Sequence, residues 1–288
     1  MTTRSIVVHP DADLLAQAAA ARLLTAVLDA QAARGSAGVV LTGGGVGIAT
    51  LEALADLPGH RAIDWSALDL WWGDERFLPA GHADRNETQA RQALLDRVPA
   101  FPERVHPVPA ARRSGPHGPD RSRTVEDAGT AALFYAGELA AAARAENPTG
   151  NPAGSSTPDG ARQQVPTFDV VLLGLGPDGH VASLFAGHPA LREEVATTVA
   201  VHDSPKPPPV RVSLTLSALN SGREVWLLAA GRAKADAVAR ALAPVPGGQG
   251  PPPDEKGSGP CGMPAGLVRG RSATRWLLDE AAASRLGR

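Results

Sequence analysis

A carboxylate and an imidazole lie two positions apart in a glycine-rich segment of the chain. Residues 174–180 are Gly-Leu-Gly-Pro-Asp-Gly-His and follow an apolar run at residues 168–173. A histidine in such a turn is a candidate general base, because its ordinary pKa of about 6.5 suits proton transfer near neutral pH. We therefore predict that Asp178 and His180 act together in catalysis. A dinucleotide site is the less favoured interpretation of these glycines, since Asp178 would repel a pyrophosphate and Pro177 lacks an N–H donor.

A second glycine-rich segment follows the apolar run at residues 39–42. Thr42, Gly43, Gly44 and Gly45 stand between that run and a helical pattern. Glycines let backbone N–H groups approach an anion closely, and the helix N-terminus adds partial positive charge. The segment is a candidate phosphate-binding turn, and a strand-to-helix turn without a ligand is the alternative. It is not a Walker loop, because no Gly-Lys-Ser/Thr follows.

Charged side chains also follow the candidate strand at residues 68–72. Asp74 and Arg76 come directly after it, and Asn86 begins the next helical pattern. Ligands of open α/β sheets bind at the carboxyl ends of strands, and a guanidinium matches phosphate or carboxylate oxygens. We predict that these three residues line the site, with an ion-paired surface turn as the alternative.

Two further cations stand at the starts of elements. Arg211 begins a candidate strand after the segment Lys-Pro-Pro-Pro-Val, and Lys234 falls in the first turn of a candidate helix. A cation is normally disfavoured at a helix N-terminus, so Lys234 suggests an anion nearby, although a solvated lysine is the plain alternative.

The composition of the chain argues against several classes of protein. The 288 residues include 28 Lys plus Arg and 30 Asp plus Glu, a net charge of −2, so no global field attracts nucleic acid or an anionic membrane. One cysteine and the lack of a His-Glu-x-x-His motif argue against a disulfide framework and a metal site. The N-terminal apolar run is too short for a signal peptide, and no run approaches the roughly 20 residues of a membrane span. We expect a cytoplasmic protein.

Short apolar runs alternate with helical patterns along the chain. This rhythm predicts an α/β protein: a three-layer α/β/α sandwich with a mostly parallel, Rossmann-like sheet. Candidate strands cover 6–9, 39–42, 68–72, 105–108, 168–173, 196–201, 211–216, 225–229 and 276–278. Candidate helices cover 11–34, 48–57, 86–98, 125–145, 233–242 and 280–285.

Three segments rich in Gly, Pro and Ser interrupt this rhythm, near residues 112–129, 147–167 and 244–264. They contain few large apolar side chains with which to offset the entropy of ordering. The rhythm resumes after each, so we predict a single domain over residues 1–288 with surface insertions. Cys261 falls in the third insertion and receives no role.

Taken together, these motifs resemble the 6-phosphogluconolactonase family, within the wider group that includes glucosamine-6-phosphate deaminase. Each segment is modestly specific, but their order and spacing are strongly so. The resemblance covers nearly the whole chain, and its segments are residues 42–45, 72–76, 85–86, 174–185, 209–215, 231–238, 264–265, 276–279 and 281–282.

The resemblance implies a cofactor-independent hydrolase of 6-phospho-D-glucono-1,5-lactone in the oxidative pentose phosphate pathway. A lactonase needs a base for water, for which we choose His180, oriented by Asp178, and a donor for the oxyanion, for which we choose Arg76. The remaining residues expected to bind the substrate or its phosphate are Thr42, Gly43, Gly44, Gly45, Asp74, Asn86, Arg211 and Lys234. The expected partner is the phosphorylated sugar lactone alone, and the expected state is a monomer or weak homodimer.

The chain departs from the family pattern in places. Val46 and Gly47 stand where Ser/Thr and Pro are usual, and Arg85 where Ser is common. An amino-sugar-6-phosphate deaminase is the nearest alternative, but that branch follows its Asp-Gly-His turn with Asn-Glu-Pro-Gly, whereas residues 184–188 here contain no Glu. A non-catalytic sugar-phosphate-binding protein and a nicotinamide-dependent oxidoreductase stay open as further alternatives.

Overall fold

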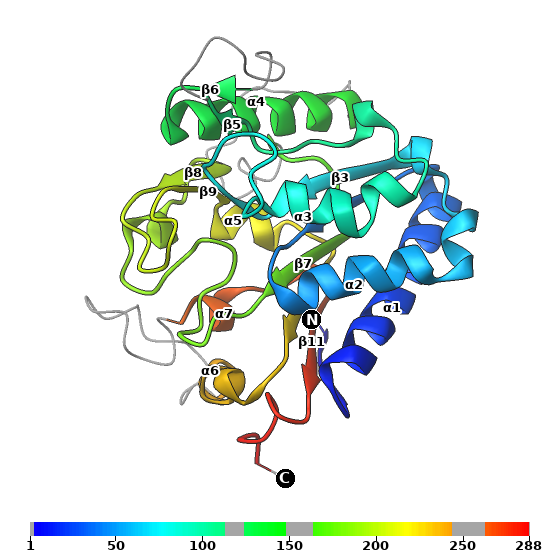
Figure 1. Ribbon diagram of the computed structural model, residues 1–288, viewed down its shortest axis with the longest axis vertical. Helices are drawn as coiled ribbons and strands as arrows, with labels where there is room; N and C mark the ends of the chain where they lie inside the picture. The colour runs from blue at the N-terminus through cyan, green and yellow to red at the C-terminus, as the bar shows by residue number, and fades with distance from the viewer. Residues whose placement is uncertain (1–2, 113–123, 148–163, 244–262, 288) are drawn as a thin grey trace.

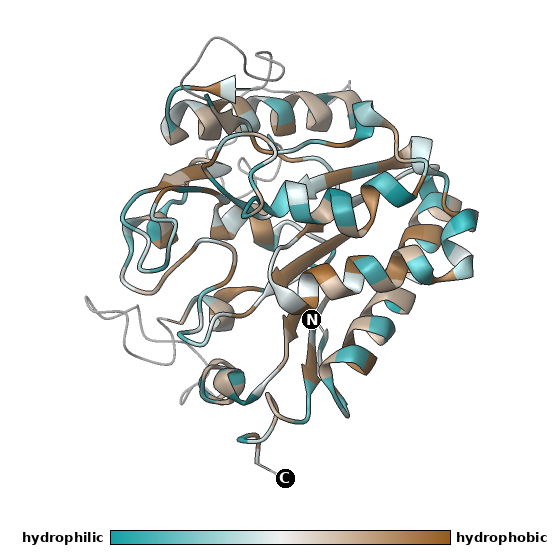
Figure 2. Cartoon of the chain, in the orientation of Figure 1, coloured by the Kyte–Doolittle hydropathy of each residue, from teal (hydrophilic) through white to brown (hydrophobic). Residues whose placement is uncertain are grey.

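The computed structural model describes residues 3–112, 124–147, 164–243 and 263–287. Its centre is a six-stranded sheet in which every neighbouring pair is parallel. The strands, in spatial order, are β1 (Thr3–His9), β11 (Ala273–Asp279), β10 (Glu224–Ala229), β7 (Val170–Gly174), β2 (Ala37–Leu41) and β3 (Leu68–Trp72). The nearly continuous apolar sequences of β2 and β7 are typical of strands covered on both faces, and Figure 2 shows β7 as hydrophobic.

The strand order reverses direction between β2 and β7. From β2 the chain proceeds outward to β3, whereas β7, β10 and β11 succeed one another toward the opposite edge. Val39 pairs with Val170, and Val40 with Val171, so the two strands that diverge in connectivity are adjacent in space. In open α/β sheets such a switch point opens a crevice beyond the carboxyl ends of the strands. The glycine-rich segments that follow β2 and β7 both lie at this switch point.

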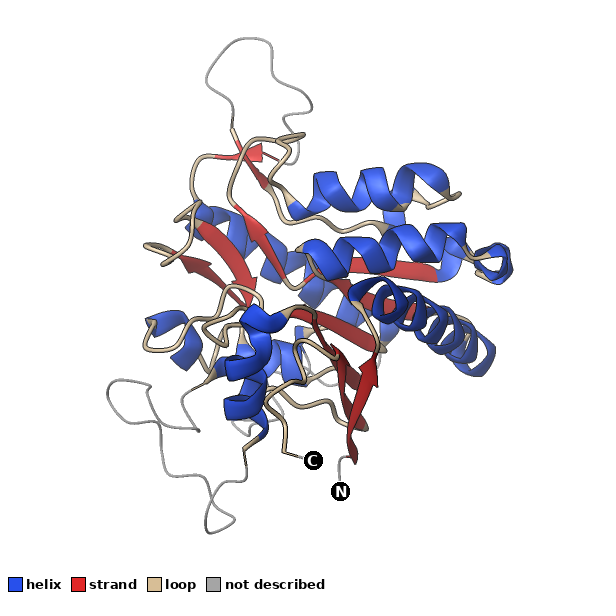
Figure 3. Cartoon of the chain, turned by 60° about the horizontal axis from the view of Figure 1, so that its bottom comes forward, coloured by secondary structure: helices blue, strands red, loops and turns tan. Residues whose placement is uncertain are grey.

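The main helices are α1 (Ala12–Arg34), α2 (Gly45–Asp56), α3 (Asn86–Ala93), α4 (Ala128–Glu146), α5 (Leu216–Asn220), α6 (Ala235–Leu242) and α7 (Pro264–Leu267). Helix α1 begins where the Asp11 carboxylate accepts the Leu14 N–H, and it ends at Gly35, whose φ of 79° suits glycine. Helices α1 and α2 pack against each other and on the sheet, while α4 lies beyond β3 (Figure 1). Helices thus flank the strands (Figure 3), which confirms the predicted α/β class.

A second, antiparallel sheet stands at the carboxyl end of the first. It contains β4 (Asp74–Arg76), β9 (Arg211–Leu214) and β8 (Thr198–Val201). Only Gly73 separates β3 from β4, and its carbonyl accepts the Leu214 N–H at 2.8 Å. The sequence-based prediction did not separate these strands from the parallel sheet and missed β4. Three residues are too few to show a period, and pairing with β9 is what makes them a strand.

Other predicted elements differ in detail. Residues 105–108 form only an isolated bridge between Val105 and Leu70 instead of a strand, because Pro107 has no N–H to continue a ladder. Residues 280–285 form turns instead of a helix, and the helix predicted at residues 86–98 ends at Ala93, followed by a short 3-10 helix, Leu95–Arg97.

The predicted insertions fall largely outside the described residues, as does Cys261. Their described margins are ordered: β6 (Thr124–Val125) pairs with β5 (Ala110–Ala111), and α4 begins at Ala128. The first insertion therefore reaches less far than residue 129. None of the described helices has the length and apolar character required of a membrane span.

Candidate active site at the carboxyl edge of the sheet

The turn that carries His180 begins one residue after β7. The Gly179 N–H donates to the Gly176 carbonyl at 2.9 Å, and the Gly176 N–H donates to the His180 carbonyl, also at 2.9 Å. Pro177 occupies the second position of this turn, where its fixed φ is favourable, and Gly179 has a φ of 86°. The local sequence therefore folds the chain back and presents Asp178 and His180 together at the switch point.

The Asp178 carboxylate holds the His180 ring. Nδ1 of the imidazole lies 2.6 Å from Oδ1 of Asp178, and the imidazole side chain is only 16% exposed. Although burial by itself raises it, the pKa of Asp178 lies well below its ordinary value, because His180 and Lys206 both hydrogen-bond to the carboxylate. An ionised acceptor at Nδ1 keeps the proton of the neutral ring on that nitrogen. Nε2, which has no hydrogen-bond partner among the described residues, is then free to accept a proton.

Phe185 lies between the His180 ring and Arg211. Its ring lies 4.5 Å from the His180 ring, centroid to centroid, and the Arg211 guanidinium carbon lies 5.8 Å from the Phe185 centroid. Arg211 is 5% exposed, and burial lowers its pKa. The guanidinium is thus part of the floor of the site.

The donors of Arg211 are directed at its own loop. Nε donates to the Pro208 carbonyl at 3.1 Å, and Nη2 donates to the carbonyls of Lys206 and Pro207 at 3.0 and 3.1 Å. Nη1 lies 3.5 Å from Oγ of Ser183. Contact of this residue with a substrate, expected from the family resemblance, stays a prediction.

Lys206 contacts Asp178, and Lys234 interacts electrostatically with both. The Lys206 ammonium lies 3.2 Å from Oδ1 of Asp178. Lys234 ends the short 3-10 helix Arg232–Lys234; burial lowers its pKa, the Lys206 charge lowers it further, and Asp178 opposes both. The role of Lys234 in binding a substrate stays a prediction. Lys206 was not predicted as a site residue; its position before three prolines was the available signal, but only Arg211 was taken from that segment.

The other glycine turn borders the same crevice. Oγ1 of Thr42 accepts the Gly174 N–H at 3.2 Å, so Thr42 ties the end of β2 to the end of β7. Gly44 has a φ of 86°, and Cβ atoms on Gly44 and Gly45 would meet no atom within 4 Å. Helix α2 begins at Gly45 without a side-chain cap. The N–H groups of its first turn therefore have no side-chain acceptor within the described residues, and Gly44 and Gly45 are exposed.

Asp74 and Asn86 are buried beneath this turn. Nδ2 of Asn86 donates to the Asp74 carbonyl at 2.8 Å, and Ser183 donates its hydroxyl to Oδ2 of Asp74 at 2.6 Å. Oδ1 of Asn86 is buried without a hydrogen-bond partner in the described residues and occupies the space where a Cβ on Gly43 would stand. Gly43 is required by this close approach, a reason that the sequence pattern did not reveal.

Arg76 lies beside Arg211 in the register of β4 and β9. Its Nη1 donates to the Asp84 carbonyl at 2.6 Å, while its Nε is buried and unpaired within the described structure. An unpaired buried donor is unfavourable unless a ligand or water satisfies it. Arg76 therefore has donor capacity left for an anion, as does Arg85, whose Nε is also buried and unpaired in the described residues.

Glu75 links β4 to α3 through hydrogen bonds of its buried carboxylate. Its carboxylate accepts the N–H groups of Arg76, Asn86 and Glu87 at 2.7–2.9 Å. Burial raises the pKa of Glu75 to about 7, against the opposing effect of Arg85, whose guanidinium lies 3.7 Å away. Sequence reasoning assigned neither residue a role, because a buried ion pair leaves no sign in local sequence.

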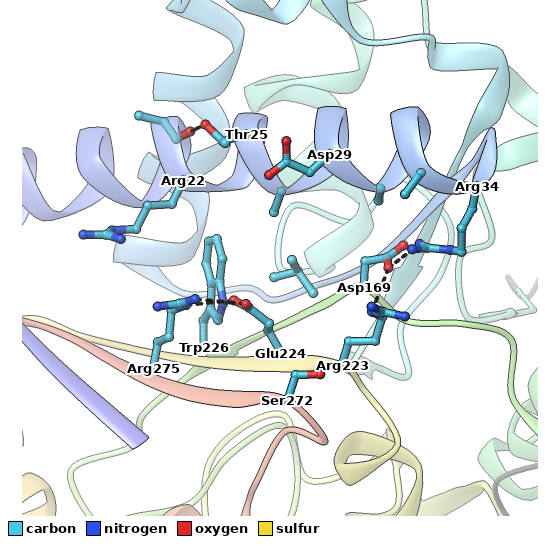
Figure 4. Close-up of a pocket in the computed structure, with 15 residues that line it drawn as sticks. Arg22, Thr25, Asp29, Arg34, Asp169, Arg223, Glu224, Trp226, Ser272 and Arg275 are labelled. Atoms are coloured by element: carbon cyan, nitrogen blue, oxygen red, sulfur yellow. Dashed lines mark hydrogen bonds and ion pairs between the residues drawn. The ribbon is translucent and has the colours of Figure 1, made fainter. Parts of the chain in front are cut away.

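A pocket of about 670 Å³ lies at the opposite, amino edge of the sheet, between α1 and the starts of β7, β10 and β11. Figure 4 shows that two of its three acidic groups are paired, Asp169 with Arg34 and Arg223, and Glu224 with Arg275, whereas no ion pair is drawn to Asp29. Its lining contains no histidine, so the carboxyl edge, where an imidazole is held by a carboxylate, is the better candidate for chemistry. Within the described ranges, no group of three or more His, Cys, Asp or Glu residues could hold a metal ion.

Comparisons with known proteins agree with this geometry. The family described as glucosamine-6-phosphate isomerases/6-phosphogluconolactonase matches residues 10–276. A 6-phosphogluconolactonase of Streptomyces coelicolor is 54% identical over 286 residues, which are 99% of this chain and 96% of that protein. The corresponding protein of Mycobacterium tuberculosis is 44% identical over 282 residues, 98% of each chain.

Solved structures resemble the whole chain as well. The 6-phosphogluconolactonase of Trypanosoma brucei superposes with a TM-score of 0.73 at 26% identity and covers both chains completely. A monomeric glucosamine-6-phosphate deaminase superposes with a TM-score of 0.67 at 16% identity, covering 98% of this chain and 99% of its own, a likeness of fold alone.

Proposed function

Because the chain belongs to the family of glucosamine-6-phosphate isomerases and 6-phosphogluconolactonases, we propose that it hydrolyses 6-phospho-D-glucono-1,5-lactone to 6-phosphogluconate with His180 as the base. The observation that carries the mechanism is the hydrogen bond between Asp178 and His180, which leaves Nε2 free, while Lys206 contacts the same carboxylate. The reaction needs no cofactor.

In the first step, Nε2 of His180 takes a proton from a water molecule as the water oxygen attacks the lactone carbonyl carbon. Asp178, ionised and hydrogen-bonded to Nδ1, stabilises the imidazolium that forms. The bond between the carbonyl carbon and the ring oxygen then breaks, and the imidazolium returns its proton to that oxygen. The products are a carboxylic acid, which ionises, and a hydroxyl group.

The negative charge that develops on the carbonyl oxygen needs a donor held in place beforehand. We assign this role to Arg76, whose Nε is buried and unpaired among the described residues. Asp74 and Asn86 shape the wall beside it through their mutual hydrogen bond.

The phosphate binds at Lys234 and the glycine turn after β2 in this proposal. Lys234 supplies charge, and the exposed N–H groups of the turn at Gly43, Gly44 and Gly45 supply directional donors. Thr42 holds that turn against β7 through the Gly174 N–H. Binding a remote phosphate positions the lactone for attack and so contributes to the rate.

A coupled assay tests the function. Glucose 6-phosphate and its dehydrogenase generate the lactone, and its disappearance is compared with and without the protein, because the lactone also hydrolyses spontaneously. His180→Ala should retain the fold and lose about 10²–10⁴-fold in kcat. His202→Ala, which removes an exposed imidazole elsewhere, is the matched control. No acceleration by the wild type would refute the activity, whereas unchanged kcat in His180→Ala would refute only the mechanism.

A further inference from the structure

We propose that Lys206 is a phosphate-binding residue that acts together with Lys234, and that Arg211 is the positioning residue that holds Lys206 in place. This inference rests on the proposed function, since it assigns the contacts of the substrate's phosphate. It replaces the expectation that Arg211 itself binds the phosphate.

The hydrogen bonds of Arg211 argue for a supporting role. Three of its N–H groups donate to the consecutive carbonyls of Lys206, Pro207 and Pro208 at 3.0–3.1 Å. Its Nη1 is directed at Ser183 and lies 4.0 Å from Oδ2 of Asp74. An incoming phosphate would have to displace the carbonyls of Pro207 and Pro208, which have no other donor on the described residues, and that of Lys206, which also accepts the Ser204 hydroxyl at 3.0 Å. Arg211 therefore holds the loop at residues 206–208 in place.

Lys206 is differently placed, at the surface of the same loop. Its side chain is 35% exposed, and its ammonium contacts Asp178, the carboxylate that orients His180. The backbone of Lys206 is held by Arg211, while its side chain reaches toward the catalytic turn. An ammonium in this position can contact a substrate that reaches Nε2 of His180.

The local charge balance indicates an anionic partner. Lys206 contacts Asp178 at 3.2 Å, the charge of Lys206 lowers the pKa of Lys234, and Asp178 is the carboxylate that opposes this repulsion. Two ammonium groups against one carboxylate leave an excess positive charge in a partly desolvated site. A phosphate dianion would remove the repulsion, because each ammonium group can donate to its oxygens.

Comparing a lactone that has a phosphate with one that lacks it shows whether Lys206 contacts the phosphate or helps to orient His180. Lys206→Met keeps most of the aliphatic stem and removes the charge. We expect it to raise KM for the phosphorylated lactone about ten-fold or more, and to leave kcat/KM for glucono-1,5-lactone, which has no phosphate, within about two-fold. Lys206→Arg should restore most of the lost affinity. An equal loss on both lactones would overturn the proposal, as would an unchanged KM for the phosphorylated one.

A double-mutant cycle tests whether Arg211 holds Lys206 in place. Arg211→Met should raise KM for the phosphorylated lactone, and adding Lys206→Met should raise it little further, because both changes act through one ammonium group. If the two substitutions instead raise KM by independent factors that multiply, Arg211 binds the phosphate directly. Should Arg211→Met not fold, Lys206→Met and Lys206→Arg decide the proposal by themselves.

The inference is separable from the proposed activity. Calorimetric titration with 6-phosphogluconate and with gluconate measures phosphate recognition without turnover. We expect the wild type to bind 6-phosphogluconate more tightly than gluconate. If Lys206→Met loses this preference and Lys206→Arg keeps it, the phosphate site is supported even if no lactone is hydrolysed. A preference that survives in Lys206→Met refutes the site even if the lactonase activity is present.

Discussion

The imidazole of His180 lies in the space that a Cβ atom on Gly176 would occupy. The same hypothetical atom would also collide with Oδ1 of Asp178. The absence of a side chain at residue 176 is therefore what lets the carboxylate and the imidazole meet across the turn.

Gly176→Ala should displace the imidazole and lower kcat by about 10²-fold or more, since general-base catalysis depends on the position of the base. Steady-state kinetics measure this, with circular dichroism to confirm the fold. Gly137→Ala is the matched control: this exposed glycine of α4 has open space around it, so kcat should not change, and helix propensity should raise stability by up to about 1 kcal/mol. A Gly176→Ala enzyme with wild-type kcat would show that the ring position is not critical.

Asp178→Asn should lower kcat by about 10²–10⁴-fold. An amide N–H directed at Nδ1 forces the ring proton onto Nε2, which can then no longer accept a proton from water. Kinetics at saturating lactone provide the measurement, and Asp203→Asn, an exposed residue with a φ of 54° that suits Asn, serves as control. Comparable activity in both variants would be inconsistent with the assigned tautomer.

Glu75 should make stability depend on pH. Burial raises its pKa from 4.5 to about 7 in the folded chain, so its contribution to stability is fully present below pH 4.5 and is lost as the pH rises through about 7. Glu75→Gln stays neutral throughout. The free energy of unfolding of the wild type, minus that of Glu75→Gln, should therefore fall across this interval in urea titrations.

Glu52→Gln provides the comparison for this titration, because Glu52 is exposed on α2 and no salt bridge to it is formed within the described structure. The difference in the free energy of unfolding between Glu52→Gln and the wild type should change little with pH. If the Glu75→Gln difference is equally flat, the buried carboxyl titrates at its ordinary value.

Tyr135→Phe should destabilise the fold by about 1–3 kcal/mol. The Tyr135 hydroxyl accepts the Trp72 N–H at 2.8 Å and donates to the Trp72 carbonyl at 3.0 Å, which satisfies the outer edge of β3. The variant would leave both buried backbone groups without this partner. Chemical denaturation measures the loss, and Phe134→Ala, at a neighbouring residue that is 60% exposed, should change stability by no more than about 0.5 kcal/mol. Equal effects would argue that the edge hydrogen bonds contribute nothing.

Local sequence was sufficient for much of the fold and part of the site. Apolar runs predicted all six strands of the parallel sheet within three residues, since strands that are buried require such runs. The helix predicted at residues 11–34 matches α1 within one residue, because the capping by Asp11 and the left-handed turn at Gly35 depend on neighbouring residues. The same holds for the catalytic turn, where Pro177 and Gly179 set the backbone that brings Asp178 to His180.

Tertiary structure alone decided the contacts between segments distant in the chain. Nothing local separates β8 and β9 from the parallel sheet, since their place depends on a three-residue partner, β4. The positions of Lys206 against Asp178, and of Asn86 against Gly43, likewise depend on packing. Short-range periodicity and turn chemistry are encoded within a few residues, whereas burial, charge pairing and the direction of Arg211's donors arise only when the strands bring remote segments to one edge.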